Sequence, residues 1–300
     1  MNTSVWREML RLARPWLLAG TLLFYAIGAG IAHFLGTRID LAVYILGQAC
    51  VLLLVLSSAY LSEYFAMLEY PVLKRGQNGA NRAEEFLRLR NALVQAAAVA
   101  LTVGAVLTVM LFARGAVNLP AILFLGTAFL LAFFYAVPPM RLARSGYGEL
   151  VTALFLTGIT PALAYALQTG ETHRLLILLT FPLTAICIAM LLANDLETYY
   201  TDIKDGRKTL MVAVGWQRGM SLHNILVLFS YLLVGLAAVL KLPWPLAWPM
   251  LATMPVGLFQ IWQMWQINNG VKPRWRLLRM TAYASFGIMA YLVAFALWTG

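Results

Sequence analysis

The sequence predicts an all-α, polytopic membrane protein, a bundle of about nine transmembrane helices around a central cavity. Three observations predict this class. Hydrophobic residues make up 62% of the 300-residue chain, charged residues make up only 11%, and the mean hydropathy is +0.78. A soluble fold must cover its surface with polar side chains, so this composition requires lipid as the outer solvent. The apolar residues also fall into uncharged runs of roughly 20 residues, the length that crosses a hydrocarbon core about 30 Å thick.

Nine such runs predict nine membrane spans. Their approximate ranges are 16–35, 41–62, 91–113, 117–137, 150–169, 175–194, 221–240, 244–266 and 280–298. Residues 1–15, before the first run, place arginines around Trp6 and Leu10. That pattern is typical of a short amphipathic helix lying in the headgroup region. No domain boundary is visible, so we expect residues 1–300 to form a single domain.

The basic residues set the expected orientation. With the N-terminus in the cytoplasm, 18 of the 22 Lys and Arg residues fall on the inside. This asymmetry follows the positive-inside rule and predicts an outside C-terminus. Residues 70–90 and 196–220 are then expected to be cytoplasmic cap loops. The expected location is the inner membrane of a cell, with the functional site facing the cytoplasm.

Two function classes are disfavoured by the composition. The net charge of +10 does not indicate nucleic acid as a partner, because the basic residues sit between apolar runs as loop anchors. The cores of the predicted spans lack charged residues, which weighs against an ion-coupled transporter. Cys50 and Cys187 both lie inside apolar runs and offer neither a disulfide framework nor metal-ligand spacing.

An acidic segment, residues 194–208, follows the sixth predicted span. Asp195 and Asp202 are seven residues apart, so on a helix they lie within about 20° of one face. Asn194, Thr198 and Asp202 follow a four-residue spacing on the adjoining face. A row of oxygen ligands at a helix end suits Mg²⁺, which lets an acidic surface bind an anionic diphosphate. The alternative is that these residues are only the solvated end of a membrane helix.

A similar segment, residues 62–76, ends the second predicted span. Glu63 and Glu69 lie among aromatic residues, and Lys74 and Arg75 follow them. Both segments face the same side of the membrane, four helices apart. Together they predict a pocket built from two halves.

Basic and aromatic side chains near these segments are candidate substrate contacts. The expected diphosphate contacts are Arg141, Lys204, Arg207, Lys208, Lys74 and Arg75. The expected pocket aromatics are Tyr60, Tyr64, Tyr135 and Tyr199. Interfacial snorkelling and the aromatic belt at the membrane surface explain the same residues without a function. Glu149 is either a general base or, as an acid in the first turn of a helix, a cap of that helix.

Two stretches of the chain resemble a known family. The first comprises Asn194-Asp195, Asp202, Gly206, Thr209-Leu210, Val212 and Gly215. The second comprises FYAVPP at 134–139, Arg141-Leu142 and Gly146-Tyr147-Gly148-Glu149-Leu150. They resemble the second Asp-rich motif, and the loop between spans four and five, of the UbiA superfamily of intramembrane prenyltransferases. Within that superfamily the stretches are most similar to the 1,4-dihydroxy-2-naphthoate polyprenyltransferases of the menaquinone pathway.

The resemblance implies a helical bundle around a central cavity, open sideways to lipid and capped by cytoplasmic loops. It also implies transfer of a polyprenyl group from its diphosphate to a hydrophobic aromatic or quinone-precursor acceptor. Mg²⁺, held by two Asp-rich motifs, then assists departure of the diphosphate. The implied catalytic residues are Asp195, Asp202 and Glu63. The implied metal ligands are Asn194, Asp195, Thr198, Asp202, Glu63 and Glu69.

The chain departs from the family pattern at the first Asp-rich motif. The family's Asn-x-x-x-Asp-x-x-x-Asp corresponds here to Ser62, Ala66 and Tyr70, and none of these is a carboxylate. Glu63 and Glu69 lie about 120° apart on a helix, so they converge only if that helix unwinds. Three outcomes remain open: a divergent prenyltransferase that uses the glutamates, a member that cyclises or hydrolyses a prenyl diphosphate, and an inactive member that binds such a lipid.

Overall fold

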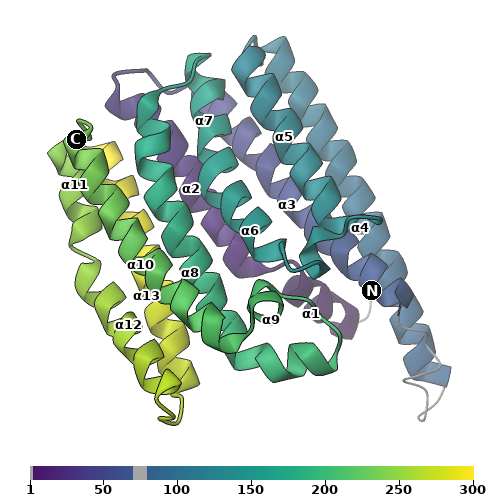
Figure 1. Ribbon diagram of the computed structural model, residues 1–300. Helices are drawn as coiled ribbons and strands as arrows, with labels where there is room; N and C mark the ends of the chain where they lie inside the picture. The colour runs from purple at the N-terminus through teal and green to yellow at the C-terminus, as the bar shows by residue number, and fades with distance from the viewer. Residues whose placement is uncertain (1–2, 70–79) are drawn as a thin grey trace.

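The computed structural model describes residues 3–69 and 80–300, and its regular elements are helices (Figure 1). In chain order they are α1 (Thr3–Leu12), α2 (Pro15–Phe34), α3 (Leu41–Glu69), α4 (Ala80–Ala113), α5 (Leu119–Ala136), η2 (Leu142–Arg144), α6 (Gly148–Ala153), η3 (Leu154–Ile159), α7 (Thr160–Thr169), α8 (Arg174–Lys204), α9 (Leu210–Val214), α10 (Trp216–Val239), α11 (Trp244–Leu251), α12 (Met254–Asn268) and α13 (Trp275–Thr299). The predicted all-α membrane bundle is therefore confirmed.

Eight of the nine predicted spans are helices long and apolar enough to cross a membrane, within the described residues. One of them is the continuous run of α6, η3 and α7, in which η3 is a π-helical stretch. The remaining predicted span, 244–266, is instead two shorter helices, α11 and α12. The chain breaks at Ala252 and Thr253 because Pro255 lies in the first turn of α12, and a proline there cannot donate the backbone hydrogen bond that would continue α11.

The described residues of the two segments expected to be cap loops are mostly helical. Helix α4 begins at Ala80, α8 continues to Lys204, and α9 and α10 take up most of 210–220. Hydropathy indicates where a helix leaves the lipid. Beyond that point, ion pairs between polar side chains one turn apart stabilise the helix. In α4 the Glu84–Arg88 pair, 2.5 Å across one turn, is such a contact. Residues 70–79 lie outside the described part of the chain.

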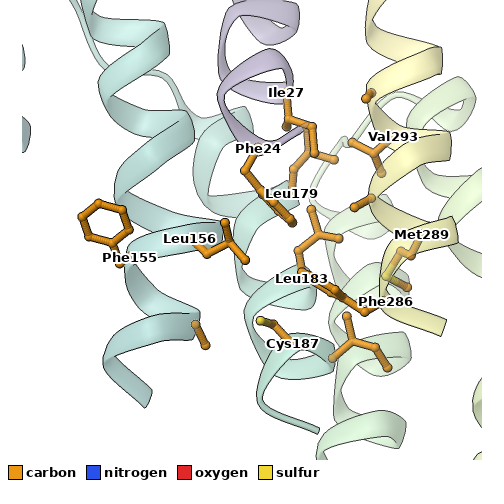
Figure 2. Close-up of a cluster of buried hydrophobic side chains, with 14 of the residues drawn as sticks. Phe24, Ile27, Phe155, Leu156, Leu179, Leu183, Cys187, Phe286, Met289 and Val293 are labelled. Carbon is orange, nitrogen blue, oxygen red and sulfur yellow. The ribbon is translucent and has the colours of Figure 1, made fainter. Parts of the chain in front are cut away.

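Helix α8 lies at the centre of the bundle and positions the site. In its most apolar stretch 72% of the residues are buried, against 17% in α4 and 17% in α5. The outer helices therefore turn their apolar side chains to lipid, as a multi-pass integral membrane protein requires. Leu179 and Leu183 of α8 pack with Phe24 of α2, Leu156 of η3 and Phe286 of α13 (Figure 2).

Helices α2 and α7 approach each other closely at one glycine. A Cβ at Gly28 would lie 2.1 Å from the carbonyl oxygen of Pro161, so no larger residue fits. This contact holds the first span against the span that begins with α6.

One end of the bundle gathers the polar elements, and we call it the α1 end. It holds α1, α9, the last turns of α3 and α8, and the loop 137–147, and the C-terminus lies at the opposite end (Figure 1). Residues 3–12 form the helix expected near the N-terminus. Val5 and Met9 of α1 pack against Tyr60 and Leu93, while Trp6 and Leu10 are exposed.

Candidate active site

The carboxylates of α8 form an acidic group at the α1 end. Asp202 is only 5% exposed, and its Oδ2 accepts a hydrogen bond of 2.7 Å from the Thr198 hydroxyl. The Arg207 guanidinium lies 3.9 Å from the other oxygen of Asp202. Asp195 is two turns earlier on the same helix, and its charged neighbours include Glu149, Asp202 and Arg207. The seven-residue spacing thus places both aspartates on one face of α8.

A third carboxylate, Glu149, reaches this group from the start of α6. Its Oε2 accepts a hydrogen bond of 3.0 Å from the backbone N–H of Leu210, the first residue of α9. Glu149 therefore joins α6 to the N-terminus of α9, where a negative charge is favoured. We name Glu149, Asp195 and Asp202 the acidic half of the site.

Two oxygens, one within the acidic half and one on the residue before Asp195, are buried without a hydrogen-bond partner. They are Oδ1 of Asn194 and Oδ2 of Asp195. A buried oxygen left unpaired costs free energy, and a bound cation would satisfy it. Among the residues that the structure describes, no three His, Cys, Asp or Glu side chains stand close enough together to enclose a metal ion. Mg²⁺ does not need such a cage, because it binds through one or two carboxylates, waters and substrate phosphates. The acidic half therefore fits Mg²⁺.

The end of α3 presents a different arrangement, which we name the basic half. Glu63 lies 3.6 Å from the Arg14 guanidinium, and Arg14 also donates a hydrogen bond to the Tyr135 hydroxyl. Tyr135 and Glu63 raise the pKa of Arg14, so its guanidinium stays charged despite its burial. Glu69, at the last residue of α3, pairs with Arg141 and lies 3.6 Å from Arg144.

The loop 137–147 connects the two halves. Its arginines face α3, and the chain then continues into α6 with Glu149. Ser145 forms an isolated bridge with Lys208, beyond the end of α8. Gly146 has φ 90°, and a Cβ on it would lie 3.2 Å from the Cβ of Ala213. Glycine is therefore required both by the backbone conformation and by the close approach of the two segments.

The structure brings some of the predicted site residues together and separates others. Asp195, Asp202, Thr198 and Arg207 are neighbours in the acidic half. Glu63 and Glu69 do not join them, because α3 stays helical through Glu69 and each glutamate turns to an arginine. The unwinding that would let these glutamates converge is absent from α3.

The remaining predicted contacts are distributed as follows. Lys204 and Lys208 are exposed beyond the acidic half, and Arg141 faces Glu69 instead of that half. Lys74 and Arg75 lie outside the described residues. The sequence pattern predicts no site role for Arg144 or for Arg14, which falls within the amphipathic segment 1–15.

An apolar cavity of about 40 Å³ adjoins the basic half, between α2, α3, α5 and the α6–η3 run. Its lining is mostly aliphatic and includes Leu17, Val55, Leu131, Val151 and Phe155. Arg14 and Tyr135 provide its polar end. Such a volume holds only a few water-sized groups.

Of the four predicted pocket aromatics, Tyr135 alone lines this cavity. The Arg14 guanidinium carbon lies 5.5 Å from the centre of its ring. Tyr60 donates to the backbone oxygen of Met9 in α1. The rings of Tyr64 and Tyr199 each pack edge-on against the ring that follows them in the chain.

Comparison with known proteins reveals one family. Residues 87–286, two thirds of the chain, match the UbiA prenyltransferase family. A 92-residue stretch is 25% identical to the 1,4-dihydroxy-2-naphthoate octaprenyltransferase of Bacillus subtilis (strain 168). That match spans 31% of this chain and only 30% of the length of the Bacillus protein.

Solved structures share the fold over nearly the whole chain. A UbiA homologue from Archaeoglobus fulgidus bound to GPP and Mg²⁺ superimposes with a TM-score of 0.63 at 18% identity, covering 98% of this chain and 100% of that one. A digeranylgeranylglyceryl phosphate synthase superimposes with a TM-score of 0.61 at 17% identity, covering 99% of both chains. At these identities the likeness is one of fold, and together with the family match it shows that this chain belongs to the UbiA prenyltransferase family.

Proposed function

We propose that the protein is a Mg²⁺-dependent prenyltransferase that moves a polyprenyl group from its diphosphate to a hydrophobic aromatic acceptor. The observation that carries the proposal is the acidic half, in which the carboxylates of Glu149, Asp195 and Asp202 gather beside unpaired buried oxygens. The family match supports it, as does the Archaeoglobus structure that holds GPP and Mg²⁺ in the same fold.

Each part of the site has a role in this proposal. Asp195 and Asp202, with Glu149 beside them, would hold Mg²⁺, which would supply Lewis-acid assistance to the departing diphosphate. Arg207 and Lys208 contact the phosphate oxygens from the segment after α8. The apolar cavity beside Tyr135 accepts apolar atoms of a substrate, and the flanking side chains must move to admit more than a few of them.

The acceptor class follows from the resemblance and the Bacillus match. Both favour a dihydroxynaphthoate-type quinone precursor and the menaquinone branch of the family. The site then lies on the cytoplasmic side, where the Lys and Arg residues gather, within a single domain that covers residues 1–300.

Binding of a prenyl diphosphate analogue tests the metal-dependent part. Purified protein is titrated with geranyl S-thiolodiphosphate in Mg²⁺ and again in EDTA. We expect binding in Mg²⁺ only, weakened by about tenfold or more in Asp195→Asn and in Asp202→Asn, since each loses a charged ligand. Glu197→Gln is the matched control, because Glu197 is on the same helix but pairs with Arg279 at 3.4 Å. Binding that persists in EDTA and is unchanged in both aspartate variants contradicts the proposal.

A second candidate function has one observation in its favour: both glutamates of α3 are engaged by arginines and are not available to a second metal ion. A member that only binds, cyclises or hydrolyses a prenyl diphosphate would suit such a site. Radiolabelled geranylgeranyl diphosphate, incubated with and without dihydroxynaphthoate, separates the candidates. A labelled naphthoate product supports transfer, whereas labelled prenol or cyclic product without acceptor supports the second candidate.

A further inference from the structure

Two arginines that face the end of α3 share an uncommon backbone conformation. Arg14 has φ 53° and Arg141 has φ 39°, in the left-handed region that residues with a side chain seldom adopt. Strain of this kind persists only where the surrounding structure holds it, and it gathers at ligand sites. Arg14 reaches Glu63 and Arg141 reaches Glu69, so both strained residues aim a guanidinium at a carboxylate of α3.

The two ion pairs differ in how firmly the carboxylate is held. In the first pair both side chains are mostly buried, with Arg14 22% and Glu63 26% exposed. In the second pair Arg141 is 13% exposed, whereas Glu69 is 57% exposed. A carboxylate that is largely in water gains little from its ion pair. Of the two glutamates, Glu69 is therefore the one that a bound anion can displace from its arginine.

Arg141 also has a donor that Glu69 does not use. Its Nη2 is buried and has no hydrogen-bond partner. The second oxygen of Glu69 lies 3.6 Å from Arg144, so one carboxylate is shared between two guanidinium groups. A diphosphate offers more oxygens and more negative charge than a carboxylate, and guanidinium groups bind phosphate oxygens in pairs. The present arrangement leaves unused the donor that such a ligand would take.

We infer that Arg141 and Arg144 bind the diphosphate directly, and that Glu69 is an internal anion which occupies them until the diphosphate displaces it. This inference rests on the proposed function and names Arg144 and Glu69 as affinity-determining residues of the same site. The exchange replaces one anion by another and makes or breaks no covalent bond. At the end of α3 the diphosphate thus meets guanidinium groups. A second metal ion at this place would need free carboxylates instead.

Neutralising Glu69 tests the inference. If Glu69 is a competing anion, its removal strengthens diphosphate binding, whereas removal of a Mg²⁺ ligand weakens it. Geranyl S-thiolodiphosphate and inorganic pyrophosphate are titrated in Mg²⁺ into wild type and Glu69→Gln. We expect both ligands to bind Glu69→Gln roughly threefold to tenfold more tightly, since an exposed competing ion pair has been removed. The gain should shrink at high salt, where the charges are screened.

Glu84→Gln is the matched control, because it removes the same charge from an exposed pair with Arg88 on α4. We expect it to change each affinity by less than about twofold, because an exposed pair is screened by solvent. A similar gain in Glu84→Gln would reduce the Glu69 effect to net charge and overturn the inference. Weaker binding by Glu69→Gln would also overturn it, because a Mg²⁺ ligand at this position behaves in that way.

Removal of the guanidinium groups provides the complementary test. Arg141→Gln and Arg144→Gln should each weaken pyrophosphate binding by about tenfold, while thermal unfolding in detergent verifies that the variants are folded. If either variant folds and binds as wild type does, that arginine is not part of the site. If wild type binds the analogue in Mg²⁺ and Asp195→Asn does not, but Glu69→Gln gains nothing, the inference fails and the proposed function stands. If neither wild type nor Glu69→Gln binds, both fail.

Discussion

The ends of α3 and α8 have similar sequences, and their acidic residues meet different partners. Each end places acidic residues among aromatic ones at the α1 end of the bundle. In α8 two of the acids, Asp195 and Asp202, are seven residues apart and lie within about 20° of one face, whereas the two acids of α3 are six apart and diverge by about 120°. Asp195 and Asp202 therefore share their surroundings with Glu149, and Glu63 and Glu69 do not share theirs with each other. One residue of spacing thus separates a group of neighbouring carboxylates, which we propose to be the cation site, from two separate ion pairs.

Burial makes the contrast sharper. Asp202 is 5% exposed and accepts a hydrogen bond from its own helix, while Glu69 is mostly in water. A buried carboxylate near other carboxylates needs a cation to offset their repulsion. An exposed carboxylate beside two arginines needs none. In the function that we propose, the end of α8 would take the metal of a metal-bound diphosphate and the end of α3 would take its phosphates.

The largest effect is expected from the third carboxylate of the acidic half. Glu149→Gln removes the charge but keeps an oxygen that accepts from the N–H of Leu210, so α9 stays in place. We expect Mg²⁺-dependent binding of the analogue to weaken by about 10- to 100-fold. Isothermal titration measures it. Glu149→Ala loses the link to α9 as well and should also lower the unfolding temperature; equal stability of the two variants contradicts the structural role of Glu149.

An intermediate effect, on stability, is expected from the pair in the basic half. Arg14→Met or Glu63→Met alone leaves a mostly buried charge unpaired, which should destabilise the protein by about 1–3 kcal/mol. The double variant should be more stable than the sum of the single changes predicts, because no lone charge remains. Thermal unfolding in detergent provides the comparison, and strictly additive changes would show that the pair is not coupled.

The smallest effect is expected from the hydroxyl that supports Asp202. Thr198→Val keeps the shape of the side chain and removes the 2.7 Å hydrogen bond to Oδ2. A hydrogen bond to a charged group stabilises by about 1.5–3 kcal/mol when buried, and Thr198 is exposed, so a loss of about threefold in Mg²⁺ affinity is expected. Thr198→Ser restores the hydroxyl and should restore the affinity. If Thr198→Val and Thr198→Ser bind Mg²⁺ with the same affinity, Thr198 lies outside the site.

The sequence predicted the features that depend on local rules. Membrane spans follow from apolar length, because a helix in lipid must be both long and apolar. The shared face of Asp195 and Asp202 follows from the helical repeat alone. The break at Ala252 also has a local signal in Pro255, but membrane helices tolerate proline, and Pro249 lies inside α11 without ending it.

The features that the sequence did not predict depend on contacts between distant residues. Arg14 meets Tyr135 across 121 positions, and Arg141 meets Glu69 across 72 positions. The left-handed backbone that aims both arginines has no signature when the residue is not glycine or asparagine. Only packing of α2, α3 and α5 with the loop 137–147 creates the basic half, and no periodicity in the sequence describes that packing.

We propose that the end of α8 binds the metal and that the end of α3 binds the phosphates. The number of divalent ions that bind together with the diphosphate tests this proposal most directly. Mn²⁺ takes the same oxygen ligands as Mg²⁺ and is counted by electron paramagnetic resonance. Saturated with geranyl S-thiolodiphosphate, the protein should hold a single Mn²⁺ per chain, lost in Asp195→Asn and retained in Glu69→Gln. A spectrum of two coupled Mn²⁺ ions, one of them dependent on Glu69, would contradict the account.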